Sequence, residues 1–540
     1  MRFGRNVLML ACAAAAVTPL VAAVPQATAT SSKPTFATKL LTGSSGSSEP
    51  RATVAPDGTR YVDTNAADGT EVVYRSDNGL TWKQVPGTPP NQTNPTTDVD
   101  IVSTRTGRLI ASELDFTGIN FITAYSDDKG ATWTESTGTT YADTDRQWLA
   151  VGPDDATTHQ PTVYLLFHNL LSGLLTHNMF VMTSTDGGAT FGPPIPVATP
   201  PQQDWLDLQC ADSGGPSNIF YDKASNRVFV VFGTRSSPAG GCAAQPVEIN
   251  VVAANRVWVV SAPADQTTSP TAWTPHLAVN DTGTGANGAS HITGMQLAPG
   301  ASDSAGNVYV AYPESVNDYP DYDGASIKVV HASKNDLDHW STPSVVAAPG
   351  GPGNVLPHVI AGAPGKVDVA YYHGVKSGST LKWYSMAAQS LDALSSKPSW
   401  ANVQLSPVVV EPNQTASELM GACMQGQQAT LNGFACGRAA DVYGIALDKC
   451  GGLVLTWPAQ AGQRSDGTYV AQQTGGPNLG LCRAPTARSV SRSSSGDRTP
   501  TAATGGSGSL ASTGSSRWVA VGGFGLLLAG GLLARRRYLG

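Results

Sequence analysis

Ser126-Asp-Asp-Lys-Gly-Ala-Thr-Trp133 is the stretch that decides the fold, because the same pattern returns along the chain. It recurs as Ser184-Thr-Asp-Gly-Gly-Ala-Thr-Phe191, and a third copy over residues 75–82 differs at its first position. A weaker copy covers residues 333–340, where Asn and Leu replace the Asp and Gly. Regular self-similarity of this kind predicts a repeat architecture.

Strand-like segments surround each copy in a constant order. The segments that we expect as the second strand of each unit alternate or run apolar, as sheet strands do. They are residues 59–64, 109–114, 162–168, 227–233, 307–312, 366–373 and 452–458. The last unit lacks a fourth strand, and residues 36–41 could supply it and close a ring. This predicts an all-β chain with almost no helix, a β-propeller of seven four-stranded blades, with six blades as the alternative.

The repeated pattern resembles the Asp box, or bacterial neuraminidase repeat, of sialidase-like propellers. The resemblance implies a structural role for the motif. Its aspartate accepts backbone N–H groups across a tight turn, its glycine takes a positive φ, and its aromatic residue packs beneath a neighbouring hairpin. Asp77, Asp128 and Asp186 are therefore predicted to stabilise turns and to take no part in catalysis.

Both ends of the chain carry segments that are typical of export and anchoring. Arg2 and Arg5 precede an apolar stretch, and small residues follow at 27–29, which predicts a secretory signal peptide over residues 1–29. Near the other end, Leu510-Ala-Ser-Thr513-Gly514 precedes an apolar run at 518–534 and three arginines at 535–537. The chain is thus predicted to be exported.

The C-terminal order of residues 510–540 resembles the cell-wall sorting signal of Gram-positive surface proteins, with alanine where proline is more common. The resemblance implies that a sortase cleaves between Thr513 and Gly514 and joins the threonine to peptidoglycan. Before that step, the apolar run would span the membrane with its arginines inside. A permanent single-span anchor is the alternative, although the run is shorter than the about 20 residues that a bilayer needs.

The composition of the chain limits the remaining possibilities. The net charge is −7, charged residues make up 14%, and no Lys/Arg cluster lies outside the termini, which argues against nucleic-acid binding. Residues 33–483 form the predicted propeller, and the Ser/Thr/Gly-rich residues 484–509 form a flexible stalk. Apart from Cys12 in the predicted signal peptide, the chain has six cysteines. An even number in an exported protein predicts disulfides, with Cys210 and Cys242 paired and the other four, Cys423, Cys436, Cys450 and Cys482, paired among themselves.

Ligand-binding residues of a propeller are expected where the loops that precede each first strand meet the loops that join strands two and three. The first set carries Arg51, Asp98, Asp145, Arg146, Trp148, Asp212, His291, His358, Arg438 and Asp441. The second set carries Asp63, Glu113, Asp115, His168, Arg235, Glu314, Tyr372 and His373. Acids, histidines and arginines in one funnel suit a small-molecule or glycan site, although polar loops are also the rule on any propeller face.

The one cofactor that the sequence suggests is Ca²⁺. Asp318, Asp321 and Asp323 lie close together before Gly324, and carboxylates at this density suit the ion. Their spacing matches no EF-hand loop, so an ion-free acidic loop is the alternative.

The resemblance to sialidase-like proteins implies further expectations about the site. That family holds the sialic acid carboxylate with three arginines and uses a tyrosine nucleophile, its glutamate partner and an aspartate acid/base. Its first arginine lies in an Arg-Ile-Pro motif, but alignment on Pro50 places Ser48 at the arginine position, with Arg51 nearby. Arg235 and Arg438 are candidates for the other two, and a missing arginine would remove a charge-assisted bidentate contact.

Three functions remain open from the sequence. The first is a wall-anchored propeller that binds an extracellular glycan, or another extracellular partner, through Arg51, Arg146, Trp148, Arg235, His291, His358, His373 and Arg438. The second is a glycoside hydrolase, sialidase-like or otherwise, with Glu314 and either Asp98 or Asp145 as acid and base. The third is a polysaccharide lyase that uses Tyr372 and His373. The departure at Ser48 favours binding without turnover.

Overall fold

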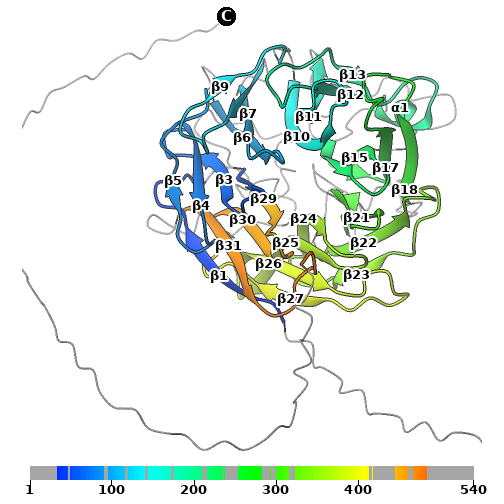
Figure 1. Cartoon of the computed structure of the whole chain (residues 1–540). Coiled ribbons are helices and arrows are strands. Elements are labelled where there is room, and N and C mark those ends of the chain that lie inside the picture. Colours follow the sequence, from blue (N-terminus) through cyan, green and yellow to red (C-terminus); the bar gives the residue numbers. More distant parts are fainter. Residues whose placement is uncertain are drawn as a thin grey trace, which may run out of the picture. The chain divides into compact units, whose positions relative to one another are not determined.

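Seven antiparallel sheets are arranged around a common axis (Figure 1). The computed structural model describes residues 33–46, 49–90, 95–115, 120–139, 141, 144–171, 175–209, 216–234, 236–237, 253–281, 292–293, 299–315, 323–412, 416, 444–459 and 466–482. The predicted signal peptide, stalk and sorting signal lie outside these residues. No helix among the described residues is long and apolar enough to span a membrane.

Each blade has four main strands that follow one another outward from the axis, and in the first three blades these strands are consecutive in the chain and nothing is added to them. Blade 1 consists of β2 (Arg51–Val54), β3 (Arg60–Asn65), β4 (Glu71–Ser76) and β5 (Lys83–Gln84). Blade 2 consists of β6 (Pro95–Ser103), β7 (Leu109–Asp115), β8 (Phe121–Ser126) and β9 (Thr134–Glu135). Blade 3 consists of β10 (Thr144–Asp154), β11 (Pro161–Leu171), β12 (Leu175–Ser184) and β13 (Ile195–Pro196).

Short strands are added to the later blades, and a short helix, α1 (Gln203–Leu208), precedes blade 4. Blade 4 consists of β14 (Pro216–Asp222), β15 (Arg227–Thr234), β17 (Arg256–Pro263) and β18 (Thr274–Asn280). Blade 5 consists of β20 (Gly300–Ser302), β21 (Asn307–Glu314), β22 (Ser326–Ser333) and β23 (Ser344–Ala347), extended by β19 (Ile292–Thr293) and β16 (Ala253–Ala254). Blade 6 consists of β24 (Asn354–Ala361), β25 (Val367–Ser377), β26 (Thr380–Ser390) and β27 (Ala401–Gln404), with β28 (Glu411–Pro412) beside β26.

The last blade closes the ring with a strand from the other end of the chain. Blade 7 consists of β29 (Gly444–Leu447), β30 (Leu453–Ala459), β31 (Gly467–Gly475) and β1 (Thr35–Leu40). β1 pairs antiparallel with β31, and Thr38 lies opposite Ala471. The seven-bladed fold, the near absence of helix and the N-terminal closing strand are therefore confirmed.

The apolar core lies between the blades. Among the described residues, one buried cluster fills each of the seven contacts between neighbouring blades, including the contact between blades 7 and 1. Val62, Val454 and Val470 belong to that closing cluster and are almost fully buried. These strands are buried on both faces, so neither face needs polar residues for contact with water. Their sequences are therefore largely apolar and do not alternate.

The aromatic residue of the repeated turn joins each blade to the one before it. Trp133 of blade 2 packs against the cluster shared with blade 1, and Phe191 of blade 3 belongs to the cluster shared with blade 2. Trp82, Trp273, Trp340 and Trp400 pack in the same way at the preceding contacts of blades 1, 4, 5 and 6. The repeat thus specifies the contact between blades as well as the turn.

The repeated aspartates make the contacts that were predicted for turn residues. Asp128 Oδ1 accepts the backbone N–H of Thr132 at 2.8 Å and the hydroxyl of Ser126 at 2.8 Å, and Asp186 accepts the N–H of Thr190 at 2.9 Å. Gly130 has a φ of +85°, and a Cβ at this position would lie 2.9 Å from a Val85 methyl group of blade 1. The glycine is therefore required by both the backbone conformation and the packing.

In the first copy, the acceptor is Asn78 and not Asp77. Asn78 Oδ1 accepts the N–H groups of Leu80 and the next residue, each at 2.9 Å, whereas Asp77 lies in the turn, is exposed and pairs with Arg75 at 2.8 Å. The predicted role of Asp77 as acceptor is wrong. This copy is one residue shorter than the others, so alignment on its tryptophan displaced Ser76 and Asn78 by one position.

A further copy of the turn, in blade 6, is absent from the sequence prediction. Ser390 donates to Asp392 Oδ1 at 3.0 Å, and the same oxygen accepts the N–H of Ser399 at 2.9 Å, directly before Trp400. Additional residues separate Asp392 from the tryptophan, and they hide the copy from a search at fixed spacing.

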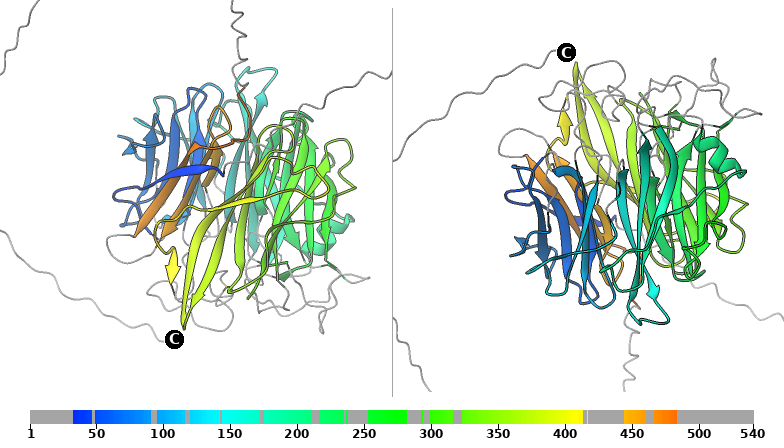
Figure 2. Two further views of the ribbon diagram at one scale, coloured as in Figure 1. Left: turned by 90° about the horizontal axis from the view of Figure 1, so that it is seen from below. Right: turned by 90° about the horizontal axis from the view of Figure 1, so that it is seen from above.

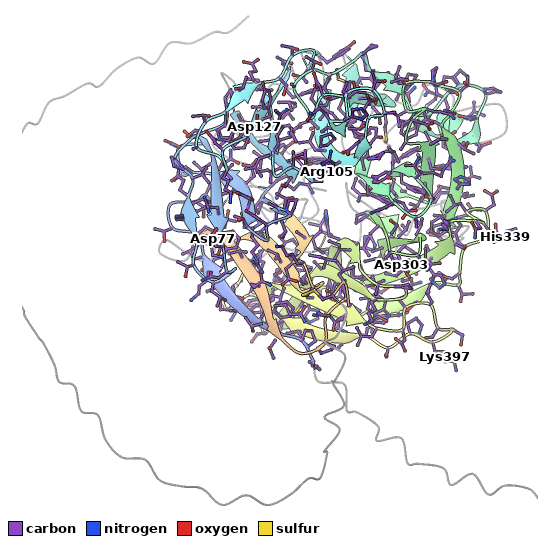
Figure 3. All side chains as sticks on the ribbon, in the orientation of Figure 1. Asp77, Arg105, Asp127, Asp303, His339 and Lys397 are labelled. Carbon is purple, nitrogen blue, oxygen red and sulfur yellow. A yellow bond between two sulfur atoms is a disulfide. The ribbon has the colours of Figure 1, made fainter. Side chains whose placement is uncertain are left out.

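The two ends of the blades differ, and we name them by their connections. At one end, the turn end, the first strand of a blade connects to the second and the third connects to the fourth. Asp57, Asp128 and Asp303 lie at this end. At the mouth end, where each first strand begins, lie Arg51 and Asp145. Figure 2 shows the sheets from the side. Figure 3 shows Arg105 and Asp303 nearer to the axis than Asp77 and His339.

The described chain ends at the turn end, where a disulfide fixes it. Cys482 is bonded to Cys450, which lies in the turn between β29 and β30. The N–H of Leu479 donates to Gly451 O at 2.8 Å, and the Leu479 side chain is buried. This pair agrees with the predicted pairing among the four C-terminal cysteines, while Cys210, Cys242, Cys423 and Cys436 lie outside the described residues.

Candidate functional site

Strand register brings the two predicted sets of polar residues together at the mouth end. Arg51 on β2 lies opposite Asp63 on β3, and Asp145 on β10 lies opposite His168 on β11. In blade 6, His373 lies opposite Asn354, a residue that the sequence analysis did not select. The first and second strands of a blade are adjacent and antiparallel. Polar residues at the start of the first strand therefore lie opposite residues at the end of the second strand.

Arg51 links three blades near the axis. Its guanidinium carbon lies 3.9 Å from the centre of the Trp148 ring of blade 3, and its Nε lies 3.8 Å from an oxygen of Asp100 in blade 2. Burial lowers the pKa of Arg51, while the charges of Asp100, Glu49 and Asp98 oppose that effect. The positive charge of Arg51 is thus balanced within the protein.

The charge of Arg51 has a counter-ion, but two of its hydrogen-bond donors have no acceptor in the described part of the chain. Among the described residues, neither Nε nor Nη2 has an acceptor within hydrogen-bond distance, although both are buried. Oε1 of Gln147, whose side chain is fully buried, also has no donor among these residues. Buried polar atoms normally have partners, so these three atoms are exceptions among the described residues.

Two irregular inner strands shape the site. The register of β10 shifts between Asp145 and Trp148, and that of β24 shifts between Val355 and His358. Within these bulges Arg146 has a φ of 58° and Leu356 a φ of 51°. Left-handed backbone is unusual for residues other than glycine, and such strain is found most often at functional sites.

Both bulges lie near enough to Arg51 to interact with it. Trp148 of blade 3 contacts its guanidinium, and the Arg51 charge acts on His358 of blade 6. Burial first, and then the Arg51 charge, hold the pKa of His358 well below its ordinary value. The imidazole of His358 is therefore neutral at pH 7.

Blades 3 and 6 carry matched pairs of a histidine and an Asp or Asn side chain. His168 Nε2 lies 3.3 Å from Asp145 Oδ2, and His373 Nδ1 donates to Asn354 Oδ1 at 2.8 Å. Burial raises the pKa of Asp145, but the neighbouring His168 and the Arg146 charge outweigh it, and the pKa falls to about 2. Asp145 is thus an ionised carboxylate, and burial lowers the pKa of His373 so that this imidazole is neutral at pH 7.

A second group of acids lies deeper, between blades 1 and 2. Asp63, Glu71 and Glu113 are almost fully buried, and Asp63 lies close enough to Glu71 to raise the pKa of that carboxyl group. Burial raises the pKa of Asp63 well above its ordinary value, and the negative charges of Glu113 and Asp100 add to the effect. Burial likewise raises the pKa of Glu71 well above its ordinary value, and the Asp63 charge adds to the effect, so the protonated form of both acids is favoured.

The predicted catalytic residues are dispersed. Glu314, at the end of β21, forms an ion pair with Lys328. Asp98 lies on β6, and its carbonyl accepts the side-chain N–H of Gln147 at 2.8 Å. Tyr372 is fully buried in the apolar cluster of blades 6 and 7. Successive strand residues face opposite ways, so the histidine after Tyr372 is the one that lies among polar groups, and the catalytic role predicted for Tyr372 finds no support.

Several predicted residues lie outside the described part of the chain. They are Asp212, Arg235, His291, Asp318, Asp321, Arg438 and Asp441, and the sorting residues Leu510, Thr513 and Gly514. Asp323 is described and exposed. The described residues contain no group of three or more His, Cys, Asp or Glu that could hold a metal ion, so the predicted Ca²⁺ site stays a prediction.

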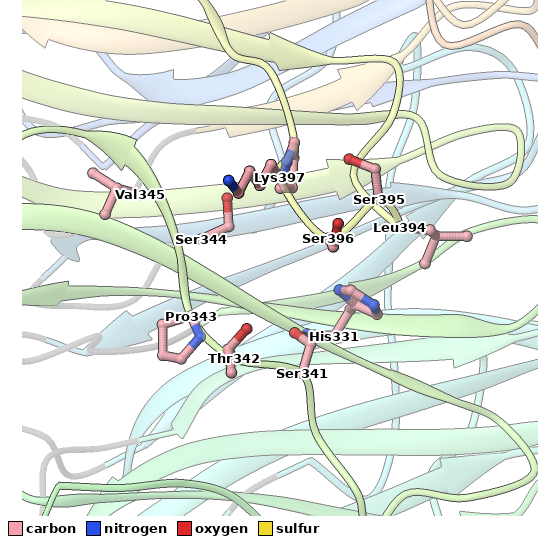
Figure 4. Close-up of a pocket in the computed structure, with 11 residues that line it drawn as sticks. His331, Ser341, Thr342, Pro343, Ser344, Val345, Leu394, Ser395, Ser396 and Lys397 are labelled. Atoms are coloured by element: carbon pink, nitrogen blue, oxygen red, sulfur yellow. Dashed lines mark hydrogen bonds between the residues drawn. The ribbon is translucent and has the colours of Figure 1, made fainter.

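A separate hollow of 530 Å³ lies on the rim, between the outer strand of blade 5 and the long turn of blade 6 (Figure 4). Residues 341–345 and 394–398 line it together with His331. Ser341 and Ser344 are already engaged, because they accept the N–H groups of His331 and Trp400 at 3.0 Å. None of the predicted site residues lies here.

Comparison with known proteins identifies the fold and no family. No family model matches the chain, and no curated protein sequence matches it. An ulvan lyase, a polysaccharide lyase solved with -[GlcA(1-4)Rha3S]- bound, is similar with a TM-score of 0.50 and 11% identity, over 82% of this chain and 96% of that chain. The same values hold for the ulvan lyase solved alone, and an alpha-L-arabinanase of Penicillium chrysogenum has a TM-score of 0.37, with 11% identity over 70% of this chain and 98% of that chain. At these identities the likeness concerns the propeller fold alone.

Proposed function

We propose that this chain is an exported, wall-anchored propeller that binds an extracellular glycan at its mouth end. The observation that carries the proposal is the pair of strained inner strands in blades 3 and 6. These strands lie on different sides of the axis (Figure 1), and each combines a left-handed residue with a histidine pair. A core that needed stability alone would have no use for backbone strain at two such positions.

The fold supports a glycan as the ligand. The ulvan lyase, which shares the propeller architecture, was solved with a polysaccharide fragment bound. Its sequence is too different to transfer any residue to this chain, so the support concerns the class of ligand only. The resemblance of the repeated turn to the Asp box of sialidase-like proteins points to the same class.

The predicted export and sorting signals support the location. The described chain ends at Cys482, at the turn end of blade 7, so attachment through the residues that follow does not require the mouth. Under this proposal the partners are a sortase, peptidoglycan as the covalent attachment site, and an extracellular glycan. The rim hollow between blades 5 and 6 has no part in it.

Glycoside hydrolysis is the alternative, and a specific observation favours it. Hydrolysis needs one ionised and one protonated carboxyl group. The mouth end has acids of both tendencies, because the pKa of Asp145 is lowered to about 2, whereas burial raises the pKa of Asp63 and Glu71 well above their ordinary values. A sialidase is less well supported than other hydrolases, because Arg51 is paired with Asp100 and is not free to hold a sugar carboxylate.

Binding of the purified protein to a panel of immobilised glycans tests the proposal. We expect at least one glycan to bind, and we expect His373→Gln and Asp145→Asn each to weaken that binding at least tenfold. Asp336→Asn, a change at an exposed turn, is the matched control and should have no effect. Equal binding by all four proteins would place the site elsewhere.

Turnover assays separate the two candidates. The purified protein is incubated with fluorogenic glycosides, including an α-sialoside, beside Asp63→Asn and Glu314→Gln. Hydrolysis that Asp63→Asn abolishes would establish the alternative. Binding without release of product supports recognition alone.

A further inference from the structure

We infer that the rim hollow between blades 5 and 6 is a second binding site, which takes a small sugar that carries a carboxylate or sulfate group. Its volume of 530 Å³ lies within the range of about 300–1,000 Å³ that is usual for ligand pockets. It shares no lining residue with the mouth, so the inference goes beyond the proposed function.

One wall of the hollow is an insertion in the repeated turn of blade 6. In blade 2 the turn aspartate, Asp128, accepts the N–H of a residue four positions further on. In blade 6 Asp392 accepts the N–H of Ser399, seven positions further on. Residues 394–398, which line the hollow, lie within this longer turn. Both turns keep the aspartate hydrogen bond, so the additional residues are not needed to form it.

The inserted residues are held against blade 6 itself. In the regular blades the turn is in direct contact with the blade before it, since the N–H of Gly87 in blade 1 donates to Gly130 O at 2.9 Å. In blade 6 the N–H of Ala393 donates to Gly365 O at 2.8 Å, and the Ala393 side chain is buried. A Cβ at Gly365 would lie 3.4 Å from Leu394 Cγ. The wall of the hollow is therefore anchored by a hydrogen bond and by packing.

The lining of the hollow has a positive charge and no carboxylate. Lys397, in the insertion, is the only charged side chain among the described residues that line it, and it forms no ion pair with a described residue. Burial lowers the pKa of His331 and outweighs the Asp303 charge, so this imidazole is neutral at pH 7. Asp392 does not line the hollow, and its Oδ1 already accepts the N–H and the hydroxyl of Ser399. The hollow therefore favours a negatively charged group.

Two serine hydroxyls of blade 5 are held as hydrogen-bond donors. Ser341 Oγ accepts the backbone N–H of His331 at 3.0 Å, and Ser344 Oγ accepts the indole N–H of Trp400 at 3.0 Å. Neither hydroxyl donates its own hydrogen to a described residue. Figure 4 shows the Lys397 side chain extending toward Ser344. A carboxylate or sulfate group accepts hydrogen bonds without donating any, so it fits an ammonium group beside hydroxyl donors.

Exposed apolar side chains lie beside these polar groups. Val345 and Leu394 line the hollow and are 48% and 41% exposed, and Pro343 and Pro398 belong to the same lining. A ligand with an apolar face would cover them and release water from their surface. A sugar ring with a carboxylate or sulfate substituent combines an apolar face with an anion, whereas inorganic sulfate supplies the anion alone.

The test is isothermal titration of the full-length protein with glucuronate, a sulfate ester of glucose, glucose itself and inorganic sulfate. We expect both acidic sugars to bind at least tenfold more tightly than glucose or inorganic sulfate, and to bind more weakly as salt screens the exposed ammonium group. Lys397→Gln should weaken this binding at least fivefold. Because Lys397 has no ion-pair partner among the described residues, this variant should melt at the same temperature as the original protein.

Two further variants complete the test. Lys39→Gln, at an exposed lysine of β1, is the matched control and should bind like the original protein. Ser344→Ala should weaken binding of the acidic sugars, and thermal unfolding establishes that it is folded, since Trp400 loses an acceptor.

The outcomes separate this site from the mouth. Absence of binding by both acidic sugars, equal binding by Lys397→Gln and the original protein, or an equal loss from Lys39→Gln would overturn the inference and leave the proposed function standing. Inorganic sulfate that binds as tightly as the acidic sugars would overturn the assignment to a sugar. His373→Gln, which tests the mouth, should leave binding at the rim unchanged.

Discussion

The turn aspartate Asp128 and the buried acids Asp63 and Glu71 at the mouth end have opposite pKa shifts. At the turn end, hydrogen bonds from Thr132, first from its hydroxyl and then from its N–H, lower the pKa of Asp128 to about 2. At the mouth end, burial raises the pKa of Asp63 and Glu71 well above the ordinary values. The difference teaches that a carboxylate surrounded by N–H and O–H donors stabilises a turn, whereas acids that are buried together, with few donors, cost stability and need another reason to be there.

The largest effect is expected from the ion pair at the mouth. Arg51→Met leaves Asp100 buried without its partner, which should lower the free energy of unfolding by about 3–5 kcal/mol. The pKa of His358 should rise, since the Arg51 charge now lowers it. Denaturant unfolding and an NMR titration of His358 measure the two effects.

The matched control for that change is Arg75→Met at the turn end. Arg75 pairs with the exposed Asp77, and loss of such a surface pair costs about 1 kcal/mol or less. Equal losses from the two arginine variants would remove the distinction between the two ends.

A smaller but still large effect is expected from the best-bonded turn carboxylate. Asp303 accepts hydrogen bonds from Asn307, the Tyr309 hydroxyl at 2.7 Å and the N–H of Gly365 at 3.0 Å in the next blade. Asp303→Ala leaves these buried donors without acceptors, which should cost about 2–3 kcal/mol in thermal or denaturant unfolding. Asp303→Asn keeps the shape and part of the bonding, so an equal loss from both changes would contradict the hydrogen-bond explanation.

The acid pair at the mouth predicts a pH dependence. The folded-state pKa of Asp63 is raised, so the protein is most stable below the unfolded-state pKa of about 4 and loses stability as the pH rises through the folded-state value. Asp63→Asn removes one titrating group and should make the stability fall less steeply with rising pH. Melting temperatures from pH 4 to 9 measure this, and parallel curves for the two proteins would show that Asp63 is ionised in the fold.

The smallest effect concerns an exposed contact between blades at the turn end. Lys129 of blade 2 donates to Asp57 of blade 1 at 2.7 Å, and this bond is the main cause of the lowered pKa of Asp57. Lys129→Gln should cost about 0.5 kcal/mol, since surface pairs are screened by water and salt. The pKa of Asp57 should rise toward its ordinary value, and the stability from this group, present above the unfolded-state pKa and lost on acidification, should be reduced. A loss larger than that of Asp303→Ala would reverse the order proposed here.

The repeat made most of the fold predictable from sequence. The patterns around Asp128 and Asp186 are local, because the turn hydrogen bonds join residues within four positions of one another. The last unit of the repeat lacks a fourth strand, which indicated that an N-terminal strand closes the ring. β1 does so by pairing with β31. Local periodicity and turn chemistry therefore determined blade number, strand order and the role of these two aspartates.

The site was decided by the tertiary structure, because its contacts join residues of different blades. No sequence pattern links Arg51 to Trp148 or His358, and the bulges at Arg146 and Leu356 that bring them together leave no periodic signal. Burial likewise separates Tyr372 from its neighbour His373, although both belong to one predicted strand. Residue type and strand position could be read from the chain, whereas the partners that set charge, protonation and free hydrogen-bonding atoms exist only once the ring has closed.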